Sequence, residues 1–124
     1  MARPALFHQG GLGTGAINGA TIAALMDCAM SIVGIVHFKG RKCGTVDLSV
    51  HFLAPLRFGA FSVDCHATRR TRGMVYAEAG ILDARGRLVA RGIGIVSRAD
   101  ESDRERERGG REDGIWHSPD GLLR

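Results

Sequence analysis

The sequence predicts an α+β fold in which an antiparallel β-sheet wraps around one long helix. Apolar residues first recur at helical spacing over about twenty residues. From residue 45 onward they recur at every second residue, as in β-strands. Short turn-forming segments separate the strand-like stretches, which implies an antiparallel meander rather than parallel βαβ units. With 124 residues, the chain is short enough for a single domain to be the default.

The helix is predicted to begin at Asn18, a favourable N-cap residue, and to end near Gly40. Residues 17–38 are apolar enough to raise the question of a membrane span. This stretch contains Asp27 and His37 and is followed by strands, so a buried core helix is the better interpretation. Its apolar face comprises Ile22, Leu25, Met26, Ala29, Met30 and Val33.

Four strand-like stretches follow, over residues 45–52, 61–68, 75–81 and about 88–97. In each of the first three, apolar residues alternate with other residues, as expected for strands with one buried face. The apolar members are Val46, Leu48, Val50 and Phe52, then Phe61, Val63, Cys65 and Ala67, then Val75, Ala77, Ala79 and Ile81.

The folded domain is predicted to span residues 1–98, with a short N-terminal segment over residues 1–17 that contains a weakly signalled edge strand at Ala5–His8. Residues 99–124 carry charges of both signs and are expected to form a solvated tail. No signal peptide opens the sequence, and the three cysteines lack metal-ligand spacing. We therefore expect a cytoplasmic protein with reduced thiols, no bound metal and no cofactor.

Asp27 is the first residue that points to chemistry, because it is the only ionisable residue between Asn18 and Val36. A carboxylate in an apolar helix is costly unless it is paired, solvated or functional. One interpretation is a catalytic carboxylate, and the other is a side chain at the wet edge of the helix.

The helix start, Asn18-Gly19-Ala20, is the second such feature. The first turn of a helix offers unpaired N–H groups, and Gly19 lacks the side chain that would keep a substrate carbonyl away from them. This is the geometry of an oxyanion hole. The alternative is an ordinary Asn cap followed by a small residue.

The spacing of these two features constrains the assembly. Gly19 and Asp27 are eight residues apart, so they lie about 12 Å apart along one helix. A site that uses both on one carbonyl must combine Gly19 of one subunit with Asp27 of another. The interpretation therefore requires a homodimer or a homotetramer built from dimers.

Three motifs resemble a known family. The ten residues from Asn18 to Asp27 (N-G-A-T-I-A-A-L-M-D) resemble the H-G-G-x-x-x-x-L-x-D signature of PaaI-like hotdog thioesterases, within the 4-hydroxybenzoyl-CoA thioesterase superfamily. Residues 45–55 (T-V-D-L-S-V-H-F-L-A-P) resemble its following strand, T-x-D-L-x-V-x-F-L-x-P, and Gly59 and residues 83–90 continue the match. The resemblance extends over about residues 9–98.

The resemblance implies a hotdog fold and hydrolysis of an acyl-CoA thioester. It implies that Asp27 is the general base or nucleophile, that the Gly19 N–H polarises the thioester carbonyl, and that the Thr45 hydroxyl holds the attacking water or the carboxylate. Asn18 stands where the family usually has His. Asn can still donate a hydrogen bond but cannot act as a general acid. Ala20 replaces the second Gly of the signature.

Two further features bear on the substrate. The family often has an Asn or Gln upstream of the signature, and Gln9 is the only nearby candidate for that position. Arg69, Arg70 and Arg72 cluster at a predicted hairpin tip and would suit the phosphates of CoA, or form a solvated turn.

Two other functions on the same fold remain as alternatives: a non-catalytic acyl-CoA binding or sensing protein, and a hydratase or dehydratase. The second of these usually needs a His near the carboxylate, which the helix does not offer beside Asp27. The net charge of +4 alone does not support nucleic acid as a partner.

Overall fold

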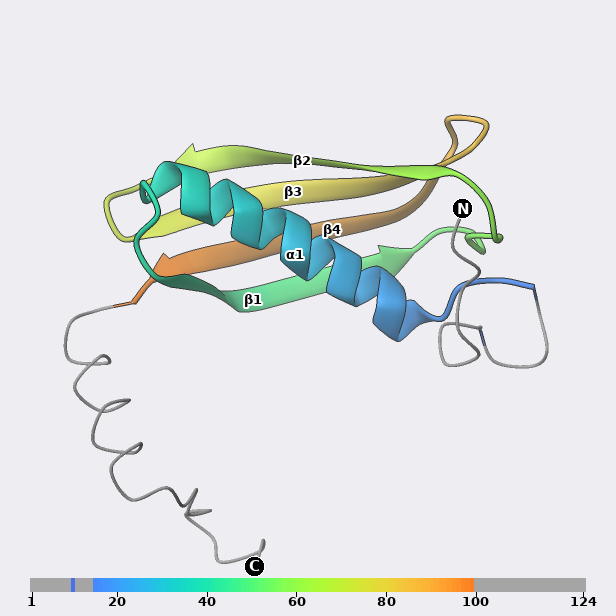
Figure 1. Cartoon of the computed structure of the whole chain (residues 1–124), viewed down its shortest axis with the longest axis horizontal. Helices are drawn as coiled ribbons and strands as arrows, with labels where there is room; N and C mark the ends of the chain where they lie inside the picture. The colour runs from blue at the N-terminus through green and yellow to red at the C-terminus, as the bar shows by residue number, and fades with distance from the viewer. Residues whose placement is uncertain (1–9, 11–14, 100–124) are drawn as a thin grey trace, which may run out of the picture.

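The computed structural model describes Gly10 and residues 15–99 of the 124-residue chain. One helix lies across one face of a four-stranded antiparallel sheet, as the α+β prediction requires (Figure 1). The predicted strand at 5–8, Gln9 and the tail from residue 100 lie outside the described residues. The elements are α1 (Gly19–His37), β1 (Cys43–Phe52), β2 (Phe61–Arg70), β3 (Met74–Asp83) and β4 (Leu88–Arg98).

Helix α1 begins and ends where the sequence predicts. Asn18 is the N-cap, in an extended conformation, and its Oδ1 accepts a hydrogen bond of 2.8 Å from the backbone N–H of Thr21. At the other end, Gly40 adopts a φ of 78° and donates its N–H to the carbonyl of Ile35 at 2.9 Å. A positive φ at glycine is a common way to end a helix.

The strand order is β1-β4-β3-β2, so the predicted meander is correct for β2, β3 and β4 and wrong for β1. Strand β1 pairs with β4 at the opposite side of the sheet from β2. Residues 53–60 carry the chain past the end of the sheet from one edge to the other (Figure 1). Alternation predicts which residues share a face but not which strand lies alongside.

A β-bulge in β1 changes which residues face the helix. The register with β4 shifts between Thr45 and Asp47, which places Thr45 opposite the buried Val96 and leaves Val46 with 63% of its surface exposed. The expectation that Val46 is buried is therefore wrong, because the extra residue of the bulge resets the alternation. Beyond the bulge, Leu48 and Val50 lie on the helix side as predicted.

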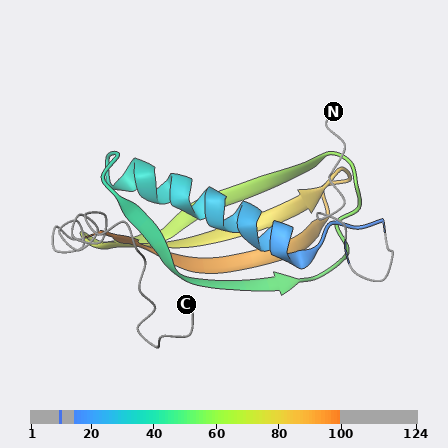
Figure 2. The same ribbon diagram turned by 60° about the horizontal axis from the view of Figure 1, so that its bottom comes forward.

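The core lies between α1 and the concave face of the sheet, which curves beneath the helix (Figure 2). Glycines in β4 make room for two methionines: a Cβ at Gly92 would lie 2.6 Å from the Met26 sulfur, and one at Gly94 would lie 2.5 Å from the Met30 sulfur. By length and composition α1 could cross a membrane, but here its buried stripe packs on the sheet. The fully buried large side chains are Met26, Met30, Leu56, Val75, Ile81, Val89 and Val96.

Candidate functional site

One flank of α1 faces β1, and two close contacts define it. A Cβ at Gly34 would lie 3.2 Å from the Cys43 sulfur, at the start of β1. A Cβ at Gly19 would lie 3.0 Å from Cζ of Phe52, the last residue of β1. The strand therefore runs antiparallel to the helix along this flank.

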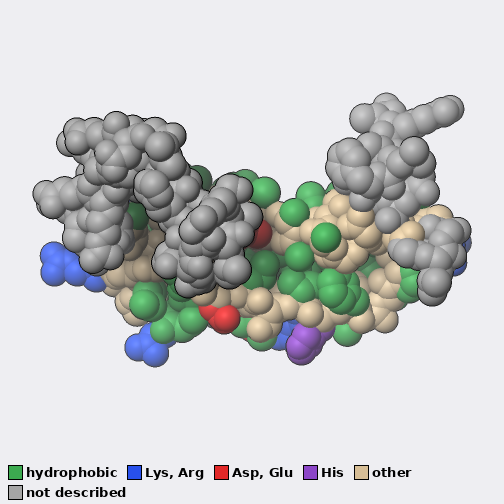
Figure 3. All heavy atoms as spheres, turned by 90° about the horizontal axis from the view of Figure 1, so that it is seen from below, with side chains coloured by type: hydrophobic (Ala, Val, Ile, Leu, Met, Phe, Trp, Pro, Cys, Tyr) green, Lys and Arg blue, Asp and Glu red, His purple; other side chains and the backbone are tan. Residues whose placement is uncertain are grey.

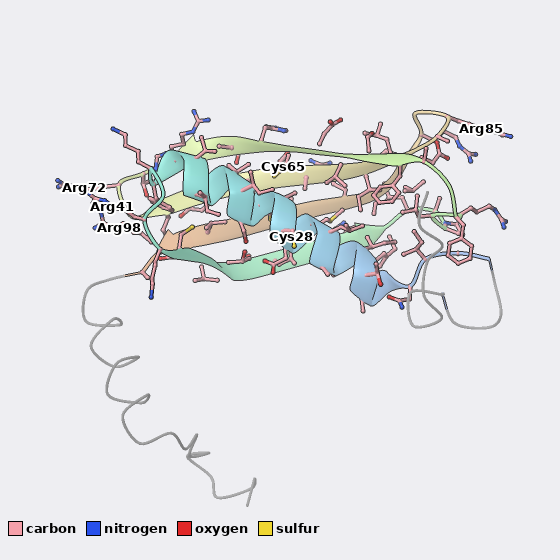
Figure 4. All side chains as sticks on the ribbon, viewed as in Figure 1. Cys28, Arg41, Cys65, Arg72, Arg85 and Arg98 are labelled. Carbon is pink, nitrogen blue, oxygen red and sulfur yellow. The ribbon has the colours of Figure 1, made fainter. Side chains whose placement is uncertain are left out.

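Asp27 lies on the same flank, abreast of the middle of β1. It precedes Gly34 by seven residues, a separation that rotates a helical position by only about 20°. Its neighbour Cys28 lies midway along the helix (Figure 4). The Asp27 side chain is exposed and has no hydrogen bond or ion pair within the described part of the chain. The Asp27 carboxyl group thus lies at the open edge of the single subunit, without a partner among the described residues.

Thr45 lies on the helix-facing side of β1, toward the C-terminal end of α1 from Asp27. Its Oγ1 is buried and lacks a hydrogen-bond partner among the described residues. A buried hydroxyl without a partner is uncommon, because it loses its hydrogen bonds to water. The structure therefore gives Thr45 an unused donor and acceptor on the flank that carries Asp27.

The start of α1 presents the unpaired N–H groups that the sequence predicts. Asn18 caps Thr21, and the N–H of Ile22 bonds the Asn18 carbonyl at 3.2 Å. No hydrogen bond between described residues uses the N–H of Gly19 or Ala20. Together with the positive end of the helix dipole, two such N–H groups have the chemistry to stabilise a carbonyl oxygen that gains negative charge.

An apolar hollow of about 500 Å³ adjoins this helix start. Its volume falls within the range of about 300–1,000 Å³ typical of small-molecule sites. Alternation along β1 predicts Phe52 only as a buried strand residue, but Phe52 is 56% exposed and its ring lies beside Gly19. The apolar side chains of the lining are Ala16, Ile17, Ile22, Phe52, Leu53, Ala54, Pro55 and Leu56.

A single chain keeps the two halves of the predicted site apart. Asp27 and Thr45 lie along one flank of α1, with Thr45 nearer to the C-terminal end of the helix, while Gly19 and the hollow lie about 12 Å from Asp27 by helix rise. The described β1 strand is an open edge, since its only partner strand is β4. Hydrophobic side chains gather along this edge (Figure 3), and Val46, Phe52 and Leu53 on or beside β1 are each more than half exposed.

The three predicted phosphate-binding arginines do not form one group. A bulge between Ala67 and Arg69 turns Arg69 to the outer face of the sheet, where its guanidinium lies 6.0 Å from the Tyr76 ring centroid. Arg70 lines a hollow between α1 and β2. Arg72 instead lines a hollow of about 410 Å³ at the C-terminal end of α1 together with Lys39, Arg41 and Arg98 (Figure 4). This grouping could not be predicted from the sequence, because its members come from separate segments.

The thiols and potential metal ligands are spread over the molecule. Cys28 is exposed, whereas burial raises the pKa of the Cys43 and Cys65 thiols. Within residues 15–99, His, Cys, Asp and Glu side chains do not gather in a group of three that could hold a metal ion.

Comparison with known proteins gives a consistent result. A family model described as the thioesterase superfamily matches residues 14–90. No curated protein matches the sequence. The fold resembles a Bacillus halodurans protein crystallised with CoA (20% identity, TM-score 0.66, 76% of this chain and 66% of that one). It also resembles the Escherichia coli PaaI protein of the phenylacetic acid degradation operon (16% identity, TM-score 0.60, 71% of this chain and 63% of that one).

A third similar structure is a Thermus thermophilus thioesterase in complex with coenzyme A and zinc (21% identity, TM-score 0.61, 87% of this chain and 89% of that one). The matched region spans slightly less than two thirds of the Bacillus and Escherichia proteins. At these identities the likeness concerns the fold, which is the hotdog arrangement of one helix on an antiparallel sheet.

Proposed function

The chain belongs to the thioesterase superfamily, and from this premise we propose that it hydrolyses an acyl-CoA thioester to a free acid and CoA. The observation that carries the proposal is the unpaired helix-start N–H of Gly19 at the rim of an apolar hollow. Asp27 supplies the complementary group, an exposed carboxylate on the flank that faces an open strand edge. Two structurally similar proteins were crystallised with CoA, which supports CoA as the thiol part of the substrate.

We place the active site between two subunits. The unpaired N–H and C=O groups of an edge strand favour pairing with another strand, and the exposed apolar residues of β1 favour burial. Two copies related by a twofold axis near residue 23 would bring Gly19 of the partner subunit level with Asp27, because residue 23 is midway between them. Ala20 and Ala23 on this flank are small enough to permit the approach.

The hydrolysis follows from the groups at this junction. The Gly19 N–H of one subunit stabilises the negative charge that develops on the carbonyl oxygen. Asp27 of the other subunit either removes a proton from water as the water oxygen bonds to the acyl carbon, or attacks that carbon directly to form an anhydride that water then cleaves. In both routes the C–S bond breaks and the CoA thiol leaves. The unpaired Thr45 hydroxyl is available to hold the water or the carboxylate.

Asn18 serves this mechanism by position. Its Oδ1 caps the helix and so fixes the first turn whose N–H groups receive the carbonyl. An amide does not titrate, so Asn18 cannot protonate the leaving thiolate. In the general-base route, the proton that Asp27 took from water passes to the thiolate. In the nucleophilic route, Asp27 is acylated when the thiolate leaves, and the thiolate takes its proton from solvent water.

We assign the CoA phosphates to the basic hollow at the C-terminal end of α1, with Arg72 joined by Arg41 and Arg98. Asp27 and His37 are separated by about 15 Å of helix. A pantetheine arm, whose backbone resembles that of a peptide, also spans about 15 Å when extended. Arg69 and Arg70 point elsewhere, so we give them lesser roles.

A binding or sensing protein without turnover is the second candidate, and the replacement of the family His by Asn18 favours it. The test is release of free thiol from a panel of short, medium, long and aromatic acyl-CoAs by the wild type, Asp27→Asn and the matched control Asp47→Asn. Asp47 is an exposed carboxylate on the outer side of β1.

We expect turnover to fall at least about 10²-fold in Asp27→Asn and to change little in Asp47→Asn, with the oligomer intact by light scattering. CoA binding without turnover in the wild type would support the sensing protein instead.

A further inference from the structure

The lining of the hollow beside Gly19 indicates which acyl groups the thioester substrate carries. We propose that it receives the acyl group, that it selects uncharged acyl groups, and that Phe52 limits their size. This inference rests on the proposed hydrolase function and specifies its substrate class. Gly19 itself lines the hollow, so a carbonyl bound at its N–H has the hollow as its nearest apolar space.

Charge is the first property that the hollow selects. All eleven described residues that line it are uncharged, and most are aliphatic. Its polar side chain is the Asn18 amide, whose Oδ1 already caps the helix. A carboxylate moved from water into such a lining loses its hydration and gains no cationic partner among the described lining residues. Acyl groups that end in a carboxylate are therefore disfavoured, whereas alkyl and aryl groups gain by burial.

Size is the second property, and Phe52 is placed to set it. Three ring carbons lie 3.0 to 3.6 Å from the position of a Cβ at Gly19, so the ring forms a wall of the hollow directly beside the residue whose N–H receives the carbonyl. Its backbone is fixed by the sheet, where Phe52 pairs with the buried Ala90. More than half of the side chain is exposed, so the ring also has a face directed away from the protein core.

A purely structural role for Phe52, as a side chain packed on the helix start, makes a different prediction. It would change turnover of all acyl groups alike. A wall of the acyl site changes the ratio between short and long acyl groups, because a methylene in an apolar pocket alters specificity by about 10- to 200-fold.

The first experiment compares butyryl-CoA with succinyl-CoA, which differ in a terminal methyl against a carboxylate. We expect kcat/KM to be at least about 100-fold higher for butyryl-CoA. The second compares decanoyl-CoA with butyryl-CoA in the wild type, Phe52→Ala and Phe52→Leu. We expect Phe52→Ala to raise the ratio of kcat/KM for decanoyl-CoA to kcat/KM for butyryl-CoA by about tenfold or more. The ratio for Phe52→Leu should lie between those of the wild type and Phe52→Ala. Phe58→Ala is the matched control, since Phe58 is 40% exposed and lines a different hollow.

Equal kcat/KM for butyryl-CoA and succinyl-CoA, or a long-to-short ratio unchanged in Phe52→Ala, would overturn the inference while leaving the hydrolase function standing. If the wild type shows no turnover, the proposed function fails, and calorimetry on Asp27→Asn still tests the hollow. Tighter binding of butyryl-CoA than of succinyl-CoA or CoA would support it, and equal affinities would contradict it.

Discussion

Replacing Gly19 by alanine adds one methyl group at the most sensitive point of the proposed site. The new Cβ would lie 3.0, 3.2 and 3.6 Å from three carbons of the Phe52 ring. Favourable carbon–carbon contacts are about 3.5–4.0 Å, so the ring must recede by about 0.5 Å. Phe52 ends its strand and is 56% exposed, which allows this movement.

The effect of Gly19→Ala on stability should therefore be small. Overpacking a closed core costs about 1–3 kcal/mol, and this site is open on one side. Alanine also gains up to about 1 kcal/mol over glycine in helix propensity. We expect the free energy of unfolding, measured by urea denaturation, to change by less than about 1 kcal/mol.

The effect of the same substitution on catalysis should be large. A methyl group beside the N–H displaces the thioester carbonyl, and a misplacement of about 1 Å costs about 10²-fold in rate. We expect kcat/KM for butyryl-CoA to fall at least about 10²-fold. Gly73→Ala is the control, because a Cβ there meets nothing within 4 Å.

The double variant Gly19→Ala/Phe52→Leu separates two causes of the loss. It relieves the contact with the ring but keeps the methyl group beside the N–H, so we expect it to stay inactive. Recovery of activity in the double variant, or activity of Gly19→Ala within about threefold of wild type, would refute the assignment of the Gly19 N–H to the carbonyl.

Three further predictions follow from the charges and thiols. Arg72→Ala should raise KM for an acyl-CoA about tenfold and leave KM for the matching acyl-pantetheine thioester, which lacks the phosphates, unchanged. Hydrogen bonds from Arg87, chiefly from its backbone N–H, hold the pKa of Asp83 below its ordinary value. The ionised Asp83 side chain therefore stabilises the folded protein at neutral pH, and this contribution is lost as pH falls through the lowered pKa. Asp83→Asn should accordingly lower Tm at pH 7, with the difference from wild type shrinking below about pH 4. Burial raises the pKa of Cys65, so at pH 8 a thiol reagent should modify the exposed Cys28 at least about tenfold faster, a difference that unfolding abolishes.

The sequence was sufficient where local chemistry decides the structure. The cap at Asn18, the spacing of Ile22, Met26 and Met30, and the positive φ at Gly40 are local features, and the helix follows them. The buried alternation in β3 is likewise readable, because that central strand has no bulge within residues 74–81.

The remaining features depend on contacts between distant segments. The bulges beside Val46 and Arg69 arise from register with neighbouring strands, which alternation within one strand does not contain. The contact of Phe52 with Gly19 depends on β1 running back along the helix. Arg72 meets Arg98 only because β4 ends beside the turn between β2 and β3. None of these features could therefore be predicted from the sequence alone.

The most direct test of the central claim, a thioesterase site shared between subunits, is to mix two inactive variants. Asp27→Asn and Gly19→Ala are combined, dissociated in mild denaturant and reassociated, and thiol release from butyryl-CoA is measured alongside native mass spectrometry. In a mixed dimer one site receives both substitutions and the other receives neither, so random pairing restores about a quarter of the wild-type sites. We expect activity to rise from background toward about a quarter of wild type as mixed dimers form. Mixed dimers without any recovery of activity would contradict a site built from Asp27 of one subunit and Gly19 of its partner.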